Sequence, residues 1–260
     1  MSSVRLAVQR TLASLALLAS VVACGPDVGV GTPTPEPPDL LPRPDIRLVF
    51  PGSQPNEDMP EAPIEVNAQA GSVAPSSDVW ITNLDDAQRR GPQVVTASLS
   101  GSFAARVDAA RVGDRIRFVV RLGTRHSLPQ DLTVISSGPS RTLAARPPEA
   151  LPCLTISPSE ELTLLPRFDA DAEAQFMLEN GCTEAVTVER AAVRVGDGGF
   201  AYSAPQSIPA GERAAIEVVS TASVERLRGD VLLLDVATPS ARGRYALGLW
   251  SISSDTSGKR

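Results

Sequence analysis

The chain holds a single histidine, so any imidazole-based catalysis or metal binding would depend on His126 alone. His126 stands in the stretch GTRHS, whose glycine and polar residues are typical of a turn between strands. The sequence contains neither a Gly-x-Ser-x-Gly nucleophile elbow nor a Walker-type phosphate loop. We therefore expect a solvated turn histidine without a catalytic role, and we predict no bound cofactor.

Two pairs of adjacent carboxylates, Asp85-Asp86 and Glu160-Glu161, are the next candidates for chemistry. Neighbouring side chains of a strand point to opposite faces, so neither pair makes an acid-base dyad by itself. Carboxylates on distant strands could still face each other. A hydrolase that uses two carboxyl groups about 5–9 Å apart therefore remains an alternative.

The acidic run DADAE at residues 169–173 begins like a calcium-binding loop. An EF-hand needs glycine at its sixth position and glutamate at its twelfth, but Ala174 and Asn180 stand there. We expect these acids to form the polar face of a turn, and we predict no metal site. A looser calcium site on the surface is the alternative.

The tripeptide Arg228-Gly229-Asp230 matches a motif that some adhesive proteins present to integrins. A match of three residues carries a high risk of chance occurrence. The apolar run VLLL follows at once, which favours a tight turn that enters a buried strand.

The amino terminus has the pattern of a secretory signal. Arg5 and Arg10 precede the apolar run TLASLALLASVVA, which is too short for a permanent membrane span. A basic region, an apolar region and a small residue before a processing point are typical of a signal peptide, here residues 1–23.

Val21, Val22 and Ala23 stand directly before Cys24 and resemble the lipobox of bacterial lipoprotein signal peptides. The resemblance implies that Cys24 becomes the new N-terminus and carries two or three acyl chains, palmitate among them, which suffices for stable membrane residence. Gly25 follows rather than aspartate, which in that family favours the outer over the inner membrane. The alternative is an ordinary secretory signal with a chance cysteine.

Residues 24–44 are predicted to form a flexible tether. Residues 25–44 contain seven prolines and show no apolar periodicity, so this segment favours extended polyproline II and cannot bury a core. At roughly 3 Å per residue it would lift a folded region up to about 60 Å from the lipid surface.

Composition limits the remaining possibilities. The net charge is −6 and becomes −8 when residues 1–23, with Arg5 and Arg10, are removed, so we predict no nucleic-acid binding. With 23 prolines and 19 glycines among 260 residues, short strands joined by turns are favoured over long helices. The fold class predicted is all-β, with two Ig-like antiparallel β-sandwich domains.

The first domain is predicted at residues 45–146. In the run RIRFVVR, Ile116 and Phe118 should face the core and the alternating arginines should face outward. The stretch VTASLSGSFAARVDAARVGDRIRFVV resembles the Ig-like modules of bacterial surface proteins, a resemblance that covers about residues 60–136.

The second domain is predicted at residues 151–253, followed by a disordered tail at 254–260. Its short strand runs are separated by turn residues at the spacing of a sandwich. The Asn180-Gly181 turn, the Gly199-Phe200 step and the PAG turn before AAIEV resemble Ig-like domains of the ASH and MSP type. Domains of that family bind or space other proteins and have no catalytic site. The resemblance implies the same role for this domain.

With Cys24 committed to lipid, Cys153 and Cys182 remain as an even pair. Exported chains meet an oxidising compartment, so we predict a disulfide between them. Two buried thiols are the alternative, and two cysteines alone make no metal site.

These features predict a non-catalytic, lipid-anchored protein of the bacterial cell envelope that acts as a binding or spacing module. Its expected partners are the membrane, through the lipid on Cys24, and a protein or glycan of the envelope. The alternative is a structural accessory subunit of an envelope export or motility complex. A carboxylate-based hydrolase is the third reading.

Overall fold

A computed structural model of the chain describes residues 40–46, 62–137, 140–147, 149–166, 170–196, 199–221 and 227–253. Within these ranges the chain forms strands and turns, and no helix occurs that could cross a membrane. The predicted signal peptide (1–23), the lipidation site Cys24, the tether up to residue 39 and the tail (254–260) lie outside the described residues. They stay predictions.

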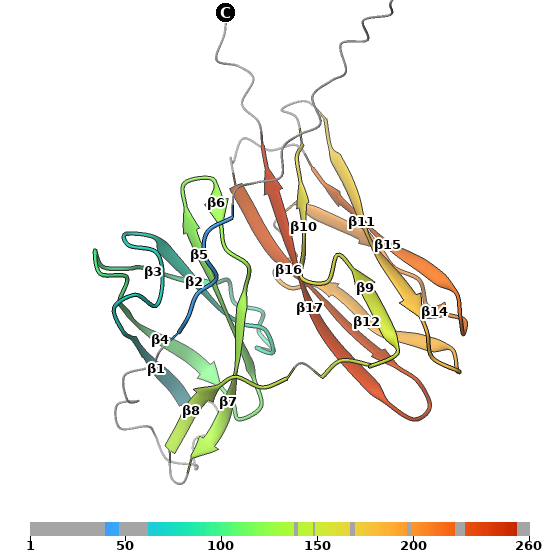
Figure 1. Cartoon of the computed structure of the whole chain (residues 1–260), viewed down its shortest axis with the longest axis horizontal. Coiled ribbons are helices and arrows are strands. Elements are labelled where there is room, and N and C mark those ends of the chain that lie inside the picture. Colours follow the sequence, from blue (N-terminus) through green and yellow to red (C-terminus); the bar gives the residue numbers. More distant parts are fainter. Residues whose placement is uncertain are drawn as a thin grey trace, which may run out of the picture. The chain divides into compact units, whose positions relative to one another are not determined.

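Eight strands in the described part form the first sandwich (Figure 1). They are β1 (Ala62–Ala68), β2 (Asp78–Asn83), β3 (Gln93–Thr96), β4 (Phe103–Ala110), β5 (Arg115–Leu122), β6 (Arg125–His126), β7 (Gln130–Ser137) and β8 (Ser140–Ala144). Strand β1 pairs with β4, and the other sheet runs β3-β2-β5-β7-β8, with β6 paired to β5. Alternating apolar residues and turn glycines favour these short antiparallel strands.

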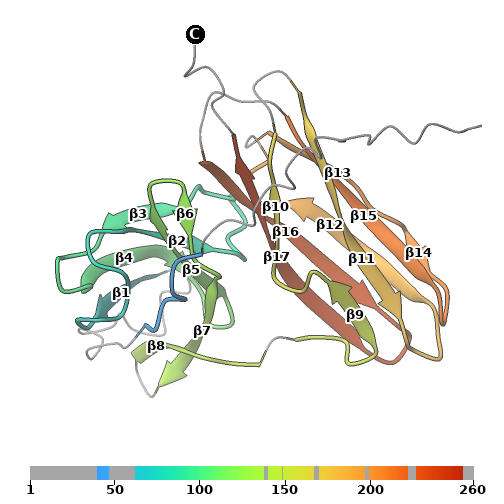
Figure 2. The same cartoon turned by 45° about the horizontal axis from the view of Figure 1, so that its top comes forward.

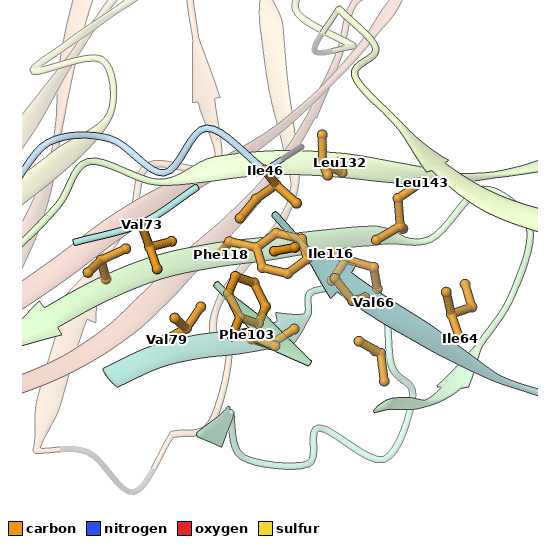
Figure 3. Packing of buried hydrophobic residues seen from close by; sticks show 14 of the residues in the cluster. Ile46, Ile64, Val66, Val73, Val79, Phe103, Ile116, Phe118, Leu132 and Leu143 are labelled. Atoms are coloured by element: carbon orange, nitrogen blue, oxygen red, sulfur yellow. The ribbon is translucent and has the colours of Figure 1, made fainter. Parts of the chain in front are cut away.

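The core of the first sandwich lies between its two sheets. Val66 of β1 and Phe103 of β4 belong to one buried cluster with Ile116 and Phe118 of β5, and Figure 3 shows these side chains gathered together. The rings of Phe103 and Phe118 lie 6.4 Å apart. The prediction that Ile116 and Phe118 face inward is confirmed, since neither has exposed surface.

Nine strands in the described ranges form the second sandwich. They are β9 (Leu154–Ser157), β10 (Glu161–Leu164), β11 (Ala172–Asn180), β12 (Val186–Val193), β13 (Phe200–Ser203), β14 (Ser207–Ile208), β15 (Arg213–Ser220), β16 (Leu227–Ala237) and β17 (Arg242–Ile252). One sheet runs β10-β17-β16-β12-β14 and the other β13-β15-β11-β9 (Figures 1 and 2). Strand β10 lies parallel to β17, and the remaining pairs of described strands in this sandwich are antiparallel.

A second buried cluster fills the space between these sheets. Phe176 and Leu178 of β11 pack with Ile216 of β15, and Leu232 and Leu234 of β16 complete the centre. The predicted all-β fold class is confirmed: the described chain forms two β-sandwiches. Each sandwich buries its own apolar cluster, as the alternation of apolar and polar residues requires.

The tether ends earlier than predicted. Leu41 and Pro44, which the composition assigns to it, are buried, and Leu41 bridges Ser127 in the parallel direction. The reason is Leu41, whose apolar side chain joins the first core despite the neighbouring prolines.

The prediction of a turn at Arg228-Gly229-Asp230 is wrong. These residues lie inside β16, where Gly229 pairs with Trp250 of β17. A Cβ atom on Gly229 would collide with the Trp250 ring, so the glycine makes room for an aromatic side chain. Asp230 is buried, and the tripeptide is therefore not displayed for adhesion.

Replacing Gly229 by alanine is expected to lower the free energy of unfolding by about 1–3 kcal/mol, because the Trp250 ring must move. Urea unfolding followed by tryptophan fluorescence measures this change. Gly91→Ala is the matched control, since a Cβ there meets open space. If both variants were equally stable, the Trp250 ring would move without a loss in the free energy of unfolding.

Candidate functional site

The outer face of β2 and β5 in the first sandwich meets β16 and β17 of the second. Val119 of β5 packs with Leu227 and Trp250 in one small buried cluster. Leu84, just after β2, packs with Val231 and Leu233 in another. We call the contact region between the two sandwiches the junction. It is the candidate functional site, because it gathers most of the side chains that could do chemistry.

Two tryptophans, an arginine and the histidine form a stack across the junction. The rings of His126 and Trp250 lie 4.1 Å apart and 22° from parallel. The Arg121 guanidinium lies 3.9 Å from the Trp80 ring centre and 6.0 Å from that of Trp250, and its Nη2 donates to the Leu227 carbonyl at 3.0 Å. Cation–π contacts of this kind gain strength where water is excluded.

His126 is not the solvated turn residue that its local sequence indicates. It lies in β6 with no exposed surface. Its Nε2 lies 3.0 Å from Oε1 of Glu161, while Trp250 donates its Nε1–H to the other carboxylate oxygen at 2.9 Å. The Glu161 carboxylate thus contacts two ring nitrogens, one from each sandwich. The local sequence indicated only a hairpin, because the residues that cover it lie at least 35 positions away.

Arg117 corrects a second expectation. The alternation in β5 assigns it to the solvent side, yet it is only 4% exposed. Its Nε and Nη2 bind both oxygens of Asp131 at 2.8 and 2.7 Å, and Nη2 also donates to the Ala246 carbonyl of β17 at 2.7 Å. The polar face of the sheet is covered by the second sandwich, and the guanidinium stays hydrogen-bonded there.

Asp85 is bound by arginines from both sandwiches. Arg115 donates Nε and Nη2 to it at 3.0 and 2.9 Å, and Arg244 donates Nη2 at 2.6 Å. Burial opposes ionisation of Asp85, but the hydrogen bonds and charge of Arg115, with the charge of Arg244, outweigh it and lower its pKa. The carboxylate therefore stays ionised and holds the two arginines in place.

Arg194, which follows β12, enters the junction from the second sandwich and is 1% exposed. Its Nε and Nη2 donate to the Asn83 carbonyl at 3.2 and 2.7 Å, and Asp86 lies 3.7 Å from Nη2. Burial lowers the pKa of Arg194, while the charges of Asp86 and Asp230 act in the opposite direction.

A cavity of about 40 Å³ lies within the junction. Its walls include Trp80, Val119, Arg194, Asp230 and Trp250. By volume it holds a few water molecules rather than an extended ligand. Burial raises the pKa of Asp230, although N–H groups of Val231, Val195 and Gly196 donate to its carboxylate and act in the opposite direction. The Asp230 carboxylate therefore holds the main chain at these three residues.

Both acidic pairs lie at the junction, but the two members of each pair bind different partners. Asp85 and Asp86 bind different arginines, and Glu160 and Glu161 bind Arg43 and His126 respectively. Of the predicted acidic turn, Asp169 lies outside the described residues, but the turn is wrong for Glu173, which lies in β11 (Ala172–Asn180). Among the residues described, no group of three or more potential ligands could hold a metal ion.

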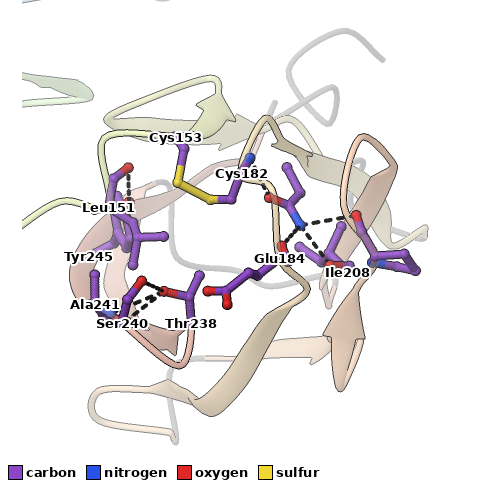
Figure 4. Close-up of a disulfide and its surroundings, with 11 residues drawn as sticks. Leu151, Cys153, Cys182, Glu184, Ile208, Thr238, Ser240, Ala241 and Tyr245 are labelled. Carbon is purple, nitrogen blue, oxygen red and sulfur yellow. Dashed lines mark hydrogen bonds between the residues drawn. A yellow bond between two sulfur atoms is a disulfide. The ribbon is translucent and has the colours of Figure 1, made fainter.

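The predicted disulfide between Cys153 and Cys182 is confirmed, with 4.9 Å between the Cα atoms (Figure 4). It joins the residue before β9 to the loop after β11. The buried Asn180 orders this loop: its amide donates to the carbonyls of Glu184, Ile208 and Pro209, and its oxygen accepts from the Cys182 N–H.

No protein-family profile matches the sequence, and a search of curated proteins found no match. Among solved structures, the ASH/PapD-like domain 7 of human CEP192 is 14% identical with a TM-score of 0.33, covering 43% of this chain and 91% of that domain. A Porphyromonas gingivalis W83 protein of unknown function is 11% identical with a TM-score of 0.34, covering 75% of this chain and 93% of that protein. The Vibrio cholerae VesB protease is 11% identical with a TM-score of 0.35, covering 80% of this chain and 67% of the protease.

Proposed function

We propose that this chain is a non-catalytic binding or spacing module of the bacterial cell envelope, held at the membrane by lipid on Cys24. The observation that carries the proposal is the junction, where polar side chains from each sandwich bind the main chain of the other. Arg117 binds the Ala246 carbonyl, Arg121 the Leu227 carbonyl and Arg194 the Asn83 carbonyl. Main-chain contacts of this kind set the spacing between the two sandwiches, which a spacer or presenting module needs.

The use of the ionisable groups supports a non-catalytic role. A general base must reach a substrate proton, but the imidazole of His126 is enclosed between Trp250 and Glu161. The cavity places one carboxylate, Asp230, among its described lining residues, whereas glycoside hydrolysis uses two. The hydrolase alternative would therefore need a second carboxylate from elsewhere.

The anchor is tested by Cys24→Ser, which removes the sulfur that would carry the first acyl chains. We expect the wild-type chain to fractionate with membranes and the variant to lose nearly all membrane association, since stable anchoring needs at least two chains. Metabolic labelling with radioactive palmitate should mark the wild type and not the Cys24→Ser variant. Cys153→Ser with Cys182→Ser is the control and should remain membrane-bound. A variant at Cys24 that stays on the membrane would refute the lipid anchor.

Crosslinking in living cells, with recovery through a C-terminal tag, tests the binding role. A binding module should recover a discrete envelope protein or glycan. One protein recovered at near-equal amount, with loss of an assembled complex on deletion, would instead favour the accessory subunit of an export or motility complex. Hydrolysis of an envelope glycan by the purified chain would overturn the non-catalytic proposal.

A further inference from the structure

Residues 40–46, which we call the strap, touch both sandwiches within seven positions. At one end the Leu41 N–H donates to the His126 carbonyl at 2.8 Å, and Leu41 is buried in the first core. At the other end the Asp45 N–H donates to the Ser72 carbonyl at 2.8 Å. Between them Arg43 reaches the second sandwich. The strap is thus fastened to the first sandwich on both sides of its contact with the second.

The contact with the second sandwich joins one guanidinium nitrogen to both oxygens of a carboxylate. Nη2 of Arg43 donates to Oε1 and Oε2 of Glu160 at 2.6 and 2.8 Å. Glu160 directly precedes β10, and its carbonyl accepts the Gly248 N–H of β17 at 2.7 Å. The main chain that carries this carboxylate is therefore tied to β17.

These contacts close a ring of residues. The strap binds His126 through Leu41 and binds Glu160 through Arg43, and the next residue, Glu161, binds the His126 ring and the Trp250 indole. Neighbouring contacts of the ring therefore share a residue or are joined by one or two peptide bonds. Losing the Arg43 link would leave the His126–Glu161 contact as the remaining polar connection of this ring between the sandwiches.

We infer that the strap is a conformational device that holds the junction closed at the His126–Trp250 stack. Release of Arg43 from Glu160 loosens β10 and lets solvent reach Trp250. The chain toward Cys24 continues covalently from the strap, so a pull on the N-terminal segment loads the Leu41 and Arg43 contacts before it reaches the strands of either sandwich. This last consequence rests on the proposed membrane anchor, whereas closure of the junction does not.

The test compares Arg43→Ala and Glu160→Gln with the wild type in the purified full-length chain. Arg213→Ala is the matched control, because Arg213 and Glu179 form a similarly exposed ion pair at 2.9 Å within the second sandwich. Acrylamide quenching reports the junction directly, since the chain has only two tryptophans and both line its cavity. Hydrogen exchange at the Leu41 and Gly248 amides reports the two ends of the ring.

We expect both strap variants to raise the tryptophan quenching constant about twofold and to speed exchange at Leu41 and Gly248 by a similar factor or more. The control should match the wild type. Faster exchange at Leu41 with unchanged quenching would overturn the inference, because the strap would then belong to the first sandwich alone. Unchanged exchange and quenching in both variants would overturn it as well. Neither result depends on lipid at Cys24, so failure here is distinct from failure of the proposed function.

Discussion

Replacing Asp85 by asparagine is expected to lower the free energy of unfolding by about 3 kcal/mol at neutral pH. The change leaves Arg115 and Arg244 without the carboxylate that now binds both of them at 2.6–3.0 Å. Removing one member of a largely buried ion pair is costly, because the remaining charge keeps its desolvation penalty. We place the loss at the lower end of the usual range, since Arg244 is 37% exposed and water can partly replace its partner.

The same variant makes a prediction about pH. The pKa of Asp85 is lowered from 3.8, so its contribution to stability is fully present above that value and is lost as the pH falls below it, through the lowered folded-state pKa. The difference in stability between wild type and variant should therefore be large at about pH 7 and shrink toward about pH 3. Urea unfolding at a series of pH values measures it.

Asp108→Asn is the matched control, because the Arg106–Asp108 ion pair is solvent-exposed on both sides. An exposed pair contributes about 0–1 kcal/mol, so this variant should follow the wild type. If Asp85→Asn were as stable as Asp108→Asn at neutral pH, the carboxylate of Asp85 would contribute nothing net to the junction.

Loss of the Cys153–Cys182 disulfide is expected to lower the free energy of unfolding by about 3–4 kcal/mol. The bridge spans 29 positions, and closing a loop of that length restricts the unfolded chain. The double variant Cys153→Ala with Cys182→Ala should show the full loss in denaturant unfolding.

Reduction provides the internal control for the disulfide. A thiol reductant should destabilise the wild type by the same amount as the double variant, and it should leave the double variant unchanged. Unfolding should begin at the loop after β11, where Asn180 holds three carbonyls next to Cys182. A double variant as stable as the oxidised wild type would mean that Asn180 orders the loop without help from the bridge.

The sequence by itself determined the strand class of the chain and the inward face of its strands. Alternation in RIRFVVR assigned Ile116 and Phe118 to the core, because side chains of a strand alternate between two faces whatever the fold. The disulfide followed from the count of cysteines in a chain whose first cysteine has another predicted role. The first inference needs only the alternation of side chains along a strand, and the second needs only an even number of remaining cysteines.

Only the tertiary structure decided what lies on the other face. Arg117, His126 and Gly229 look like surface or turn residues because alternation distinguishes apolar from polar but does not say what covers the polar side. Their partners lie 14 to 129 positions away in the chain, beyond any local pattern. A buried arginine or histidine that keeps its hydrogen bonds has the same sequence signature as a solvated one. For this reason neither the junction nor the strap that crosses it could be predicted from the sequence.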